Sequence, residues 1–308
     1  MTPAEELARH APGAATLLTL GVFDGVHLGH LSLIQTLQRQ AASRGLVPGV
    51  VTFEPHPIEV LHPGERLPLL AGLEERIRLL QQAGVDLVAP LTFTPELSRM
   101  GPEEFVHLLR RHLRMAGLIL GPDFSLGRDR AGTLAALESL GARLGFTVAG
   151  IAAFMLDGRV VSSTAIRAAL AEGDVVEAAR MLGRWYSLSG PITTTSQRGT
   201  SLGFPTANLE VSPRRALPCN GVYATIATIP DGRFGSVTNI GHRPTFGPTE
   251  RIVETHILDF RGRIYGAPLT IEFVARLRDE TTFGTAEELI AQIHRDVESA
   301  RGILGEYV

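Results

Sequence analysis

The arrangement of apolar residues changes once along the chain, and this change constrains the fold more than any other feature of the sequence. Up to about residue 183, short apolar runs alternate with stretches in which apolar residues recur at helical spacing. Such alternation is typical of a mostly parallel sheet covered by helices on both faces. We expect buried strands over residues 16–22, 49–53, 87–90, 117–120 and 147–154, and helices over 28–43, 73–84, 102–115 and 133–144.

After residue 185, strand-like runs follow one another without helical patterns between them, over 221–229, 235–240, 252–260 and 268–277. Several short strands separated by Gly, Pro and Asp favour a small β-barrel or sandwich. One helix ends the chain, because Thr285 and Glu288 form a capping-box pattern ahead of an apolar stripe. The stripe consists of Leu289, Ile293, Val297 and Leu304.

The length of 308 residues exceeds the roughly 250–300 at which one hydrophobic core stops growing, so we expect two domains. We place their boundary after a helix expected over residues 164–182. The first domain, residues 1–183, is then an α/β domain with a parallel sheet. The second, residues 184–308, is a β-barrel with a terminal helix.

Composition excludes several classes of protein. The chain has no lysine, which excludes Walker-A, pyridoxal-phosphate and protein-kinase sites that require one. A formal charge of −3 argues against broad contact with nucleic acid or anionic lipid. Cys219 is the single cysteine and cannot form an internal disulfide, which is typical of a reducing compartment. No apolar run approaches the roughly 18–20 residues of a membrane span, so we expect a cytoplasmic protein.

The segment between the first strand and the first long helix carries the strongest chemical signal. Residues 21–30 read GVFDGVHLGH. Glycine lets the backbone approach a phosphate, and a helix N-terminus directs its free N–H groups there. His27 and His30 are three residues apart, so they lie on one face and are able to donate hydrogen bonds to developing negative charge. This predicts nucleotidyl transfer to an acceptor phosphate, with release of pyrophosphate and help from Mg²⁺.

A more ordinary interpretation of the two histidines is a surface or packing role, which a His-x-x-His pair on a helix usually has. A zinc site would need a third ligand. The position of the pair between a buried strand and a glycine turn favours catalysis over both.

The same segment resembles the signature of the HxGH nucleotidylyltransferases, and specifically the adenylyltransferase half of the bacterial bifunctional riboflavin kinase/FAD synthetases. Three further segments resemble that family in the same order: residues 51–57, the loop 121–132 and the Ser-Ser-Thr-x-Ile-Arg run at 162–167. Taken alone, the last would be an ordinary helix N-cap. Ser125 and Leu126 stand where the family more often has Arg-Phe.

The resemblance implies a Rossmann-like domain whose catalytic residues include His27, His30 and Arg167. It also implies a set of nucleotide-binding residues: Gly21, Phe23, Asp24, Gly29, Asp123, Ser163 and Thr164.

A second candidate site lies in the other half. Residues 199–208 read GTSLGFPTAN, and in an extended segment the oxygens of Thr206 and Asn208 point the same way, which suits a hydrated Mg²⁺. Glu254, in a strand, could accept a proton from an alcohol that attacks a γ-phosphate. Taken separately, Pro-Thr-x-Asn is usually turn chemistry, and a strand glutamate usually lies on a solvated face.

Together these residues resemble the flavokinase module, a β-barrel unrelated to P-loop kinases, over essentially all of residues 185–301. The resemblance implies that Thr206 and Asn208 hold the metal of Mg-ATP and that Glu254 is the base toward the 5′-hydroxyl of riboflavin. Arg198, Gly199 and Gly203 would bind the nucleotide. Thr195 and Thr200 depart from the glycine-rich loop that is usual in the family.

The resemblance therefore implies a bifunctional enzyme that converts riboflavin to FMN with Mg-ATP and then FMN to FAD. Its partners would be ATP, riboflavin, FMN and FAD, with the flavins as substrates and products and with no nucleic acid or membrane. One alternative is a nucleotidylyltransferase for another phosphate or phosphopantetheine acceptor. Another is that one half binds flavin or regulates without catalysis. The sequence leaves self-association, flavin redox preference and transfer of FMN between the sites open.

Overall fold

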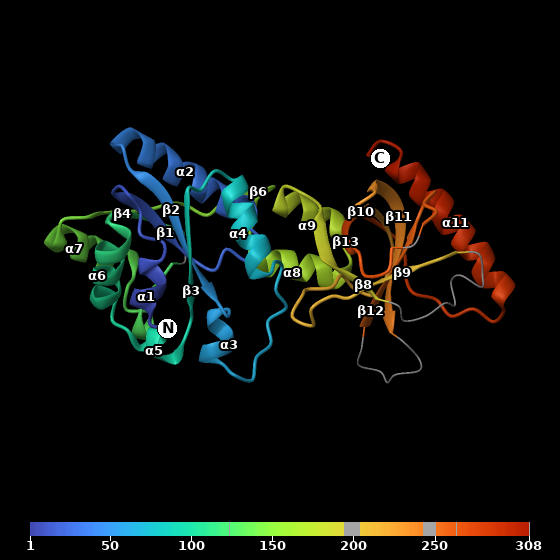
Figure 1. Ribbon diagram of the computed structural model, residues 1–308, viewed down its shortest axis with the longest axis horizontal. Helices are drawn as coiled ribbons and strands as arrows, with labels where there is room; N and C mark the ends of the chain where they lie inside the picture. Colours follow the sequence, from blue (N-terminus) through green and yellow to red (C-terminus); the bar gives the residue numbers. More distant parts are fainter. Residues whose placement is uncertain (123, 194–203, 243–250, 263, 308) are drawn as a thin grey trace. The chain divides into compact units, whose positions relative to one another are not determined.

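The computed structural model describes residues 1–122, 124–193, 204–242, 251–262 and 264–307 (Figure 1). The chain forms two compact units, Met1–Ser163 and Thr164–Val308. Several residues of the sequence-based predictions lie outside the described residues, namely Asp123, Thr195, Arg198, Gly199, Thr200 and Gly203. No helix in the described part of the chain is both long and apolar enough to cross a membrane.

The first unit contains a five-stranded sheet in the order β3-β2-β1-β4-β5, and every neighbouring pair is parallel. This confirms the parallel sheet expected from the apolar runs. Its strands are β1 (Thr16–Leu20), β2 (Val47–Glu54), β3 (Leu87–Thr92), β4 (Met115–Leu120) and β5 (Thr147–Gly150). The chain leaves β1 toward β2 on one side, while β4 pairs with β1 on the other. This is the kind of switch point at which α/β sheets bind ligands.

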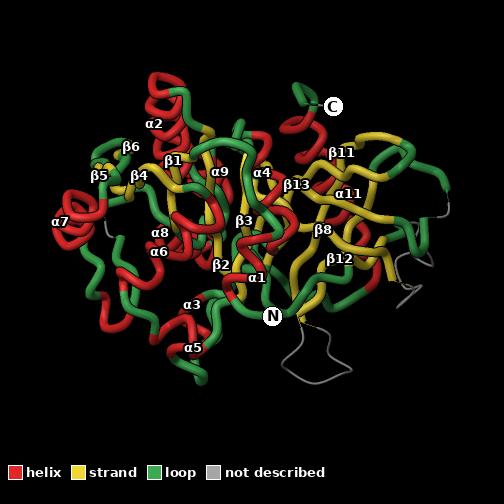
Figure 2. Tube along the Cα trace, turned by 60° about the vertical axis from the view of Figure 1, so that its left-hand side comes forward, coloured by secondary structure: helices red, strands yellow, loops and turns green. Residues whose placement is uncertain are grey.

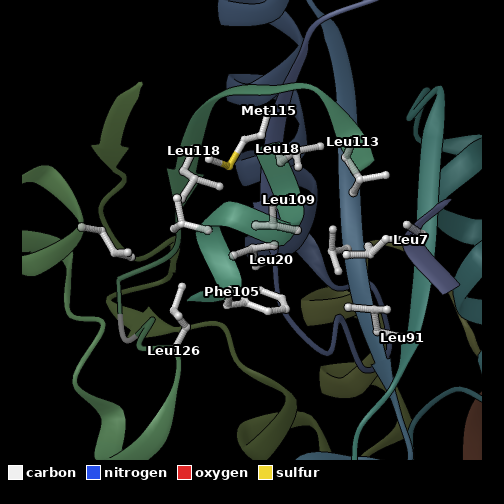
Figure 3. Close-up of a cluster of buried hydrophobic side chains, with 14 of the residues drawn as sticks. Leu7, Leu18, Leu20, Leu91, Phe105, Leu109, Leu113, Met115, Leu118 and Leu126 are labelled. Carbon is white, nitrogen blue, oxygen red and sulfur yellow. The ribbon is translucent and has the colours of Figure 1, made fainter. Parts of the chain in front are cut away.

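Helices cover both faces of this sheet because successive strand residues point to opposite faces. Leu18 and Leu20 belong to one core, with side chains from α1, α6 and α7 (Figure 3). Leu17 belongs to the other core, with side chains from α2 and α4. The helices are α1 (Pro3–Ala8), α2 (Leu28–Arg44), α3 (Pro57–Leu61), α4 (Leu73–Gln82), α5 (Pro95–Arg99), α6 (Pro102–Leu113) and α7 (Leu134–Leu144). A 3₁₀ turn, η1 (Arg128–Arg130), and a small hairpin, β6 (Met155–Leu156) and β7 (Arg159–Val160), complete the unit.

The second unit is built on a closed antiparallel barrel in the order β10-β11-β12-β9-β8-β13 (Figure 2). The sequence left a barrel and a sandwich open, and the structure is a barrel. Its strands are β8 (Tyr186–Thr193), β9 (Ala207–Leu209), β10 (Gly221–Ile229), β11 (Gly232–His242), β12 (Arg251–Ile257) and β13 (Pro268–Arg278). The C-terminal helix α11 (Ala286–Leu304) packs on β10, β11 and β13, as its apolar stripe indicated.

The single helix expected over residues 164–182 is wrong. The structure has two helices, α8 (Ser163–Glu172) and α9 (Val175–Leu182), because Gly173 adopts a left-handed φ of 80° and Asp174 caps α9. The α9 helix packs on β8 and β13 of the barrel. The compact units accordingly divide after Ser163, whereas the sequence placed the domain boundary at 183–184. Helical spacing in the sequence shows which face of α9 is buried. It does not show whether that face packs on the parallel sheet or on the barrel.

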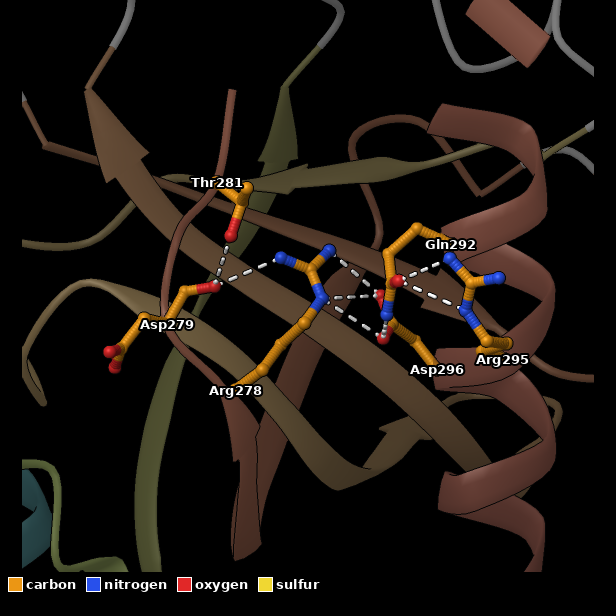
Figure 4. Close-up of polar contacts among 6 residues, drawn as sticks. All are labelled: Arg278, Asp279, Thr281, Gln292, Arg295 and Asp296. Carbon is orange, nitrogen blue, oxygen red and sulfur yellow. Dashed lines mark hydrogen bonds and ion pairs between the residues drawn. The ribbon is translucent and has the colours of Figure 1, made fainter. Parts of the chain in front are cut away.

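A polar contact fixes α11 against the barrel (Figure 4). Nε of Arg278 lies 3.0 and 3.1 Å from the two carboxylate oxygens of Asp296, and Nη2 lies 2.8 Å from one of them. Gln292 donates a further hydrogen bond of 2.8 Å to the same carboxylate. Asp296 is buried on α11, and these partners offset the cost of burying its carboxylate.

We expect the Asp296→Ala substitution to lower the free energy of unfolding of the barrel unit by about 2–3 kcal/mol, because it leaves the guanidinium of Arg278 in a largely buried position without its carboxylate. Trp185, the one tryptophan of the chain, packs against the hydrophobic core between the barrel and α11. Its fluorescence during urea unfolding therefore reports on the barrel. The control is Glu298→Ala, since the Glu298 side chain is 78% exposed and should contribute no more than about 0.5 kcal/mol. Equal effects of the two substitutions would contradict this assignment.

Candidate functional site

The turn between β1 and α2 has an unusual backbone. Phe23, Gly25 and Val26 have positive φ angles of 56°, 81° and 40°. A β-branched residue such as Val26 rarely adopts this conformation, which persists only when the surroundings enforce it. Here the side chains of Phe23 and Val26 are buried in the core beneath α2, and Val26 is 1% exposed. The turn is therefore held in one shape before any ligand binds.

His27 and His30 follow this turn and lie together. Their rings stack with centroids 3.6 Å apart and planes 18° apart, and the Phe23 ring lies 5.0 Å from that of His30. His27 caps α2, since its Nδ1 accepts a hydrogen bond of 3.3 Å from the backbone N–H of His30. A neutral His27 then carries its proton on Nε2 and presents an N–H donor there. The pair thus adds donors to the positive end of a 17-residue helix.

His30 is uncharged at neutral pH. Burial lowers the pKa of His30 well below its usual 6.5, and the neighbouring His27 lowers it further. Its buried Nδ1 has no hydrogen-bond partner within the described part of the chain. A neutral His30 ring is able to offer a ligand a hydrogen bond, but not a full positive charge.

The lowered pKa of His30 predicts how stability depends on pH. In the unfolded chain His30 binds a proton near pH 6.5, whereas in the folded chain it binds one only at a lower pH. Keeping His30 neutral therefore costs the folded chain nothing above pH 6.5, and the free energy of unfolding declines as the pH falls from 6.5 toward the folded pKa. We expect the free energy of unfolding to decline less steeply from pH 7 to pH 5 in His30→Gln than in the unmodified chain. Urea unfolding followed by circular dichroism measures this, and equal slopes would contradict it.

Asp24 lies in the middle of the turn, and its carboxylate is buried. It accepts hydrogen bonds of 3.0 and 3.1 Å from the backbone N–H of Leu70 and one of 3.0 Å from that of Ala71. A nucleotide contact for Asp24 stays a prediction, while the structure shows a role in fixing the turn to residues 70–71.

Two other residues of the motifs pack closely on this turn. A Cβ at Gly29 would lie 3.1 Å from ring atoms of His27 and 3.3 Å from the Val161 carbonyl, so only glycine fits without displacement. The Ser163 hydroxyl donates a hydrogen bond of 2.8 Å to the Asp24 carbonyl. This hydrogen bond joins the two motifs in the folded chain. Thr164 and Arg167 lie on α8 in the second compact unit, and their roles stay predictions.

A cavity of about 750 Å³ opens at the carboxyl ends of the strands. Gly21, which directly follows β1, lines the cavity. Four aromatic rings also line it: Phe53 near the end of β2, Phe93 just after β3, Phe105 on α6 and Phe124 in the loop after β4. Polar groups are fewer and include His56 and Arg130. Such a cavity suits a flat, largely apolar ligand with a polar edge. The sequence analysis missed it, although a phenylalanine at or next to the end of β2 and β3 was the available signal.

Ser125 and Leu126 also line this cavity. In the sequence analysis, these two residues stand where the family more often has Arg-Phe. The difference from the family therefore lies in the wall of the cavity.

In the barrel, the structure brings two predicted residues together. Asn208 on β9 stands directly opposite Glu254 on β12, and Asn239 on β11 stands on the other side of Glu254. Residues paired in this way lie on the same face of a sheet with Cβ atoms about 4.5–5.5 Å apart. Sequence analysis did not select Asn239, because register is not visible in composition or spacing.

The segment before β9 is tied to two other elements. The Pro205 carbonyl and Nδ1 of His256 are 2.9 Å apart, and the Phe204 ring contacts the rings of His256 and His294 at 5.5 and 5.0 Å. Thr206 lies within this segment, two residues before Asn208.

The side-chain oxygens of Thr206 and Asn208 are hard donors of the kind that Mg²⁺ prefers. The residues present therefore fit a magnesium ion that takes its remaining ligands from phosphates and water. No group of three or more His, Cys, Asp or Glu side chains with metal-binding geometry occurs among the residues that the structure describes.

Comparison with known proteins gives two family matches. Residues 10–165 match the model of FAD synthetase, and residues 182–304 match that of riboflavin kinase. Relatives named bifunctional riboflavin kinase/FMN adenylyltransferase include the protein of Escherichia coli K12, 35% identical over 96% of this chain and 95% of that one. The Pseudomonas fluorescens relative of the same name is 38% identical over 92% of both chains. The Bacillus subtilis relative is 34% identical over 93% of this chain and 92% of its own.

A solved structure shares the fold of the whole chain. It is titled as a macrolide-efflux protein from Streptococcus pneumoniae, and it superposes with a TM-score of 0.88 and 28% identity over 96% of both chains.

Proposed function

The chain belongs to the bifunctional riboflavin kinase/FMN adenylyltransferase family, and we propose that its two halves divide the two activities between the sites described above. It is an enzyme of flavin cofactor biosynthesis that phosphorylates riboflavin to FMN with ATP and adenylylates FMN to FAD with release of pyrophosphate. We assign FMN adenylylation to residues 1–183 and riboflavin phosphorylation to residues 184–308. The matched ranges 10–165 and 182–304 support this division.

The observation that carries the first assignment is the stacked His27–His30 pair on a turn whose first residues line the 750 Å³ cavity. The cavity takes the flavin ring of FMN between its aromatic side chains, which leaves the FMN phosphate toward the turn. An oxygen of that phosphate attacks the α-phosphorus of ATP. The bond from this phosphorus to the α,β-bridging oxygen breaks, and pyrophosphate leaves.

The protein stabilises the charge that moves onto the triphosphate in this step. His27 and His30 donate hydrogen bonds to its oxygens, and the N-terminus of α2 adds backbone donors. No base is needed, because the attacking phosphate of FMN is already ionised. Ser163, Thr164 and Arg167 assist in nucleotide binding in this proposal.

In the barrel, Glu254 accepts the proton of the 5′-hydroxyl of riboflavin as that oxygen attacks the γ-phosphorus of ATP. The bond to the β,γ-bridging oxygen breaks, and ADP leaves. Thr206 and Asn208 would hold Mg²⁺, which supplies neutralisation of phosphate charge. The cross-strand pairing of Asn208 with Glu254 supports this assignment, since it sets the metal-binding group beside the base.

We also place the enzyme in the cytoplasm, where its ATP is available. The single Cys219, which can form no internal disulfide, supports this.

Chromatography of the products tests the proposed function. Purified protein with ATP and Mg²⁺ is given riboflavin in one reaction and FMN in another. We expect FMN and then FAD from riboflavin, and FAD directly from FMN. FMN that stays unconverted would overturn the function of the first half, and riboflavin that stays unconverted would overturn that of the second.

A further inference from the structure

Arg76 on α4 is an arginine in an unusual place, since it is 1% exposed. Its Nη1 donates hydrogen bonds to the carbonyls of Val22, at 2.8 Å, and Phe53, at 3.2 Å. Its Nη2 pairs with the carboxylate of Glu54. Burying a guanidinium is costly unless it is paired and hydrogen-bonded, and these three contacts offset much of that cost. Its Nε has no hydrogen-bond partner among the described residues.

The contacts of Arg76 join the ends of two strands. Val22 follows β1 and directly precedes the left-handed Phe23 of the turn, and its carbonyl also accepts a hydrogen bond of 2.9 Å from the Thr52 hydroxyl. Phe53 and Glu54 end β2, and Phe53 lines the cavity. One side chain thus holds the turn that leads to the histidines and the wall of the proposed flavin cavity.

A second link connects the same part of the chain to the turn. The backbone N–H groups of Leu70 and Ala71, just before α4, bind the Asp24 carboxylate. Residues 70–76 therefore form hydrogen bonds with the turn at two residues, Val22 and Asp24. A strained backbone needs such external contacts to persist, because Phe23 and Val26 would relax without them.

We propose that Arg76 is a positioning residue for FMN adenylylation. It fixes the turn at residues 21–26, and through it His27 and His30, relative to the flavin cavity. The inference rests on the proposed function of the first half. Lysine cannot replace Arg76, because a single ammonium group on a flexible stem does not reproduce the planar set of donors that reaches two carbonyls and a carboxylate.

The test compares Arg76→Met and Arg76→Lys with Arg78→Met, a control two residues later on the exposed face of the same helix. The kcat and KM for FMN and ATP are measured at a temperature well below unfolding, and riboflavin kinase activity is measured on the same preparations. We expect kcat for FMN adenylylation to fall about 100-fold in Arg76→Met, because small displacements of reacting groups cost this much. KM values should change less. Kinase activity and the Arg78 variant should match the unmodified enzyme.

Arg76→Lys keeps the buried charge and serves if Arg76→Met does not fold. We expect a folded Arg76→Lys to lose at least about 10-fold in kcat for FMN adenylylation. Unchanged kcat in either folded Arg76 variant overturns the inference, as does an equal loss in Arg78→Met. An unmodified enzyme that does not convert FMN at all would instead overturn the proposed function.

Discussion

We expect the Glu254→Gln substitution to slow FMN formation from riboflavin strongly, while FMN supplied directly is still converted to FAD at the normal rate. We expect the rate of riboflavin phosphorylation to fall by about 10³-fold, the usual contribution of a general base. Glutamine has nearly the same shape as glutamate but cannot accept the proton of the 5′-hydroxyl. The pairing of Glu254 with Asn208 on β9 and Asn239 on β11 is a backbone pairing, which does not depend on the charge of the Glu254 side chain. The barrel should therefore keep its structure in the variant.

The measurement is initial rates of FMN formation from riboflavin and of FAD formation from FMN, on one preparation of the variant. Glu272→Gln is a matched control, because Glu272 is also a glutamate on a barrel strand and its carboxylate pairs with Arg233 at 3.0 Å. It should leave phosphorylation nearly unchanged. Kinase turnover that persists in Glu254→Gln would remove Glu254 from the role of base.

The His30→Ala substitution has the complementary effect. We expect FAD formation from FMN to fall by about 10²–10³-fold, because the triphosphate loses a preorganised donor in a buried site and His27 loses the ring that stacks on it. FMN formation from riboflavin should continue at its normal rate. The variant would then accumulate FMN when it is given riboflavin and ATP.

The control for this substitution is His107→Ala, since His107 lies on α6 with a side chain that is 57% exposed. Far-ultraviolet circular dichroism shows whether each variant is folded. A folded His30→Ala that loses both activities would contradict the division of labour, and one that keeps full adenylylation would contradict the role of His30.

The sequence predicted the architecture well where periodicity decides it. Strands β1 and β4 are buried on both faces, so their sequences show apolar residues side by side, at residues 17–18 and 118–120. The barrel strand 268–278 alternates instead. Periodicity could not predict β9, which has only three residues, or the division of residues 163–182 into two helices that Gly173 causes.

The candidate sites were predictable as motifs but not as geometry. The segment GVFDGVHLGH at residues 21–30 located His27 and His30, and the observed stacking agrees with the two rings lying on one face. The carboxylate of Asp24, by contrast, contacts the backbone of Leu70 and Ala71, which nothing local to the motif reveals. Arg76 and the aromatic wall of the cavity were missed for the same reason. They come from segments that are far apart in the sequence and meet only because parallel strands end at one edge.

The most direct test of two separate active sites in one chain is to mix the two inactive variants. Given riboflavin, ATP and Mg²⁺, His30→Ala alone should form FMN without FAD, and Glu254→Gln alone should form neither. The mixture should form FAD after a lag, as FMN released by the first variant is adenylylated by the second. FAD formed from riboflavin by either variant alone, or FMN that accumulates in the mixture without conversion, would contradict the account.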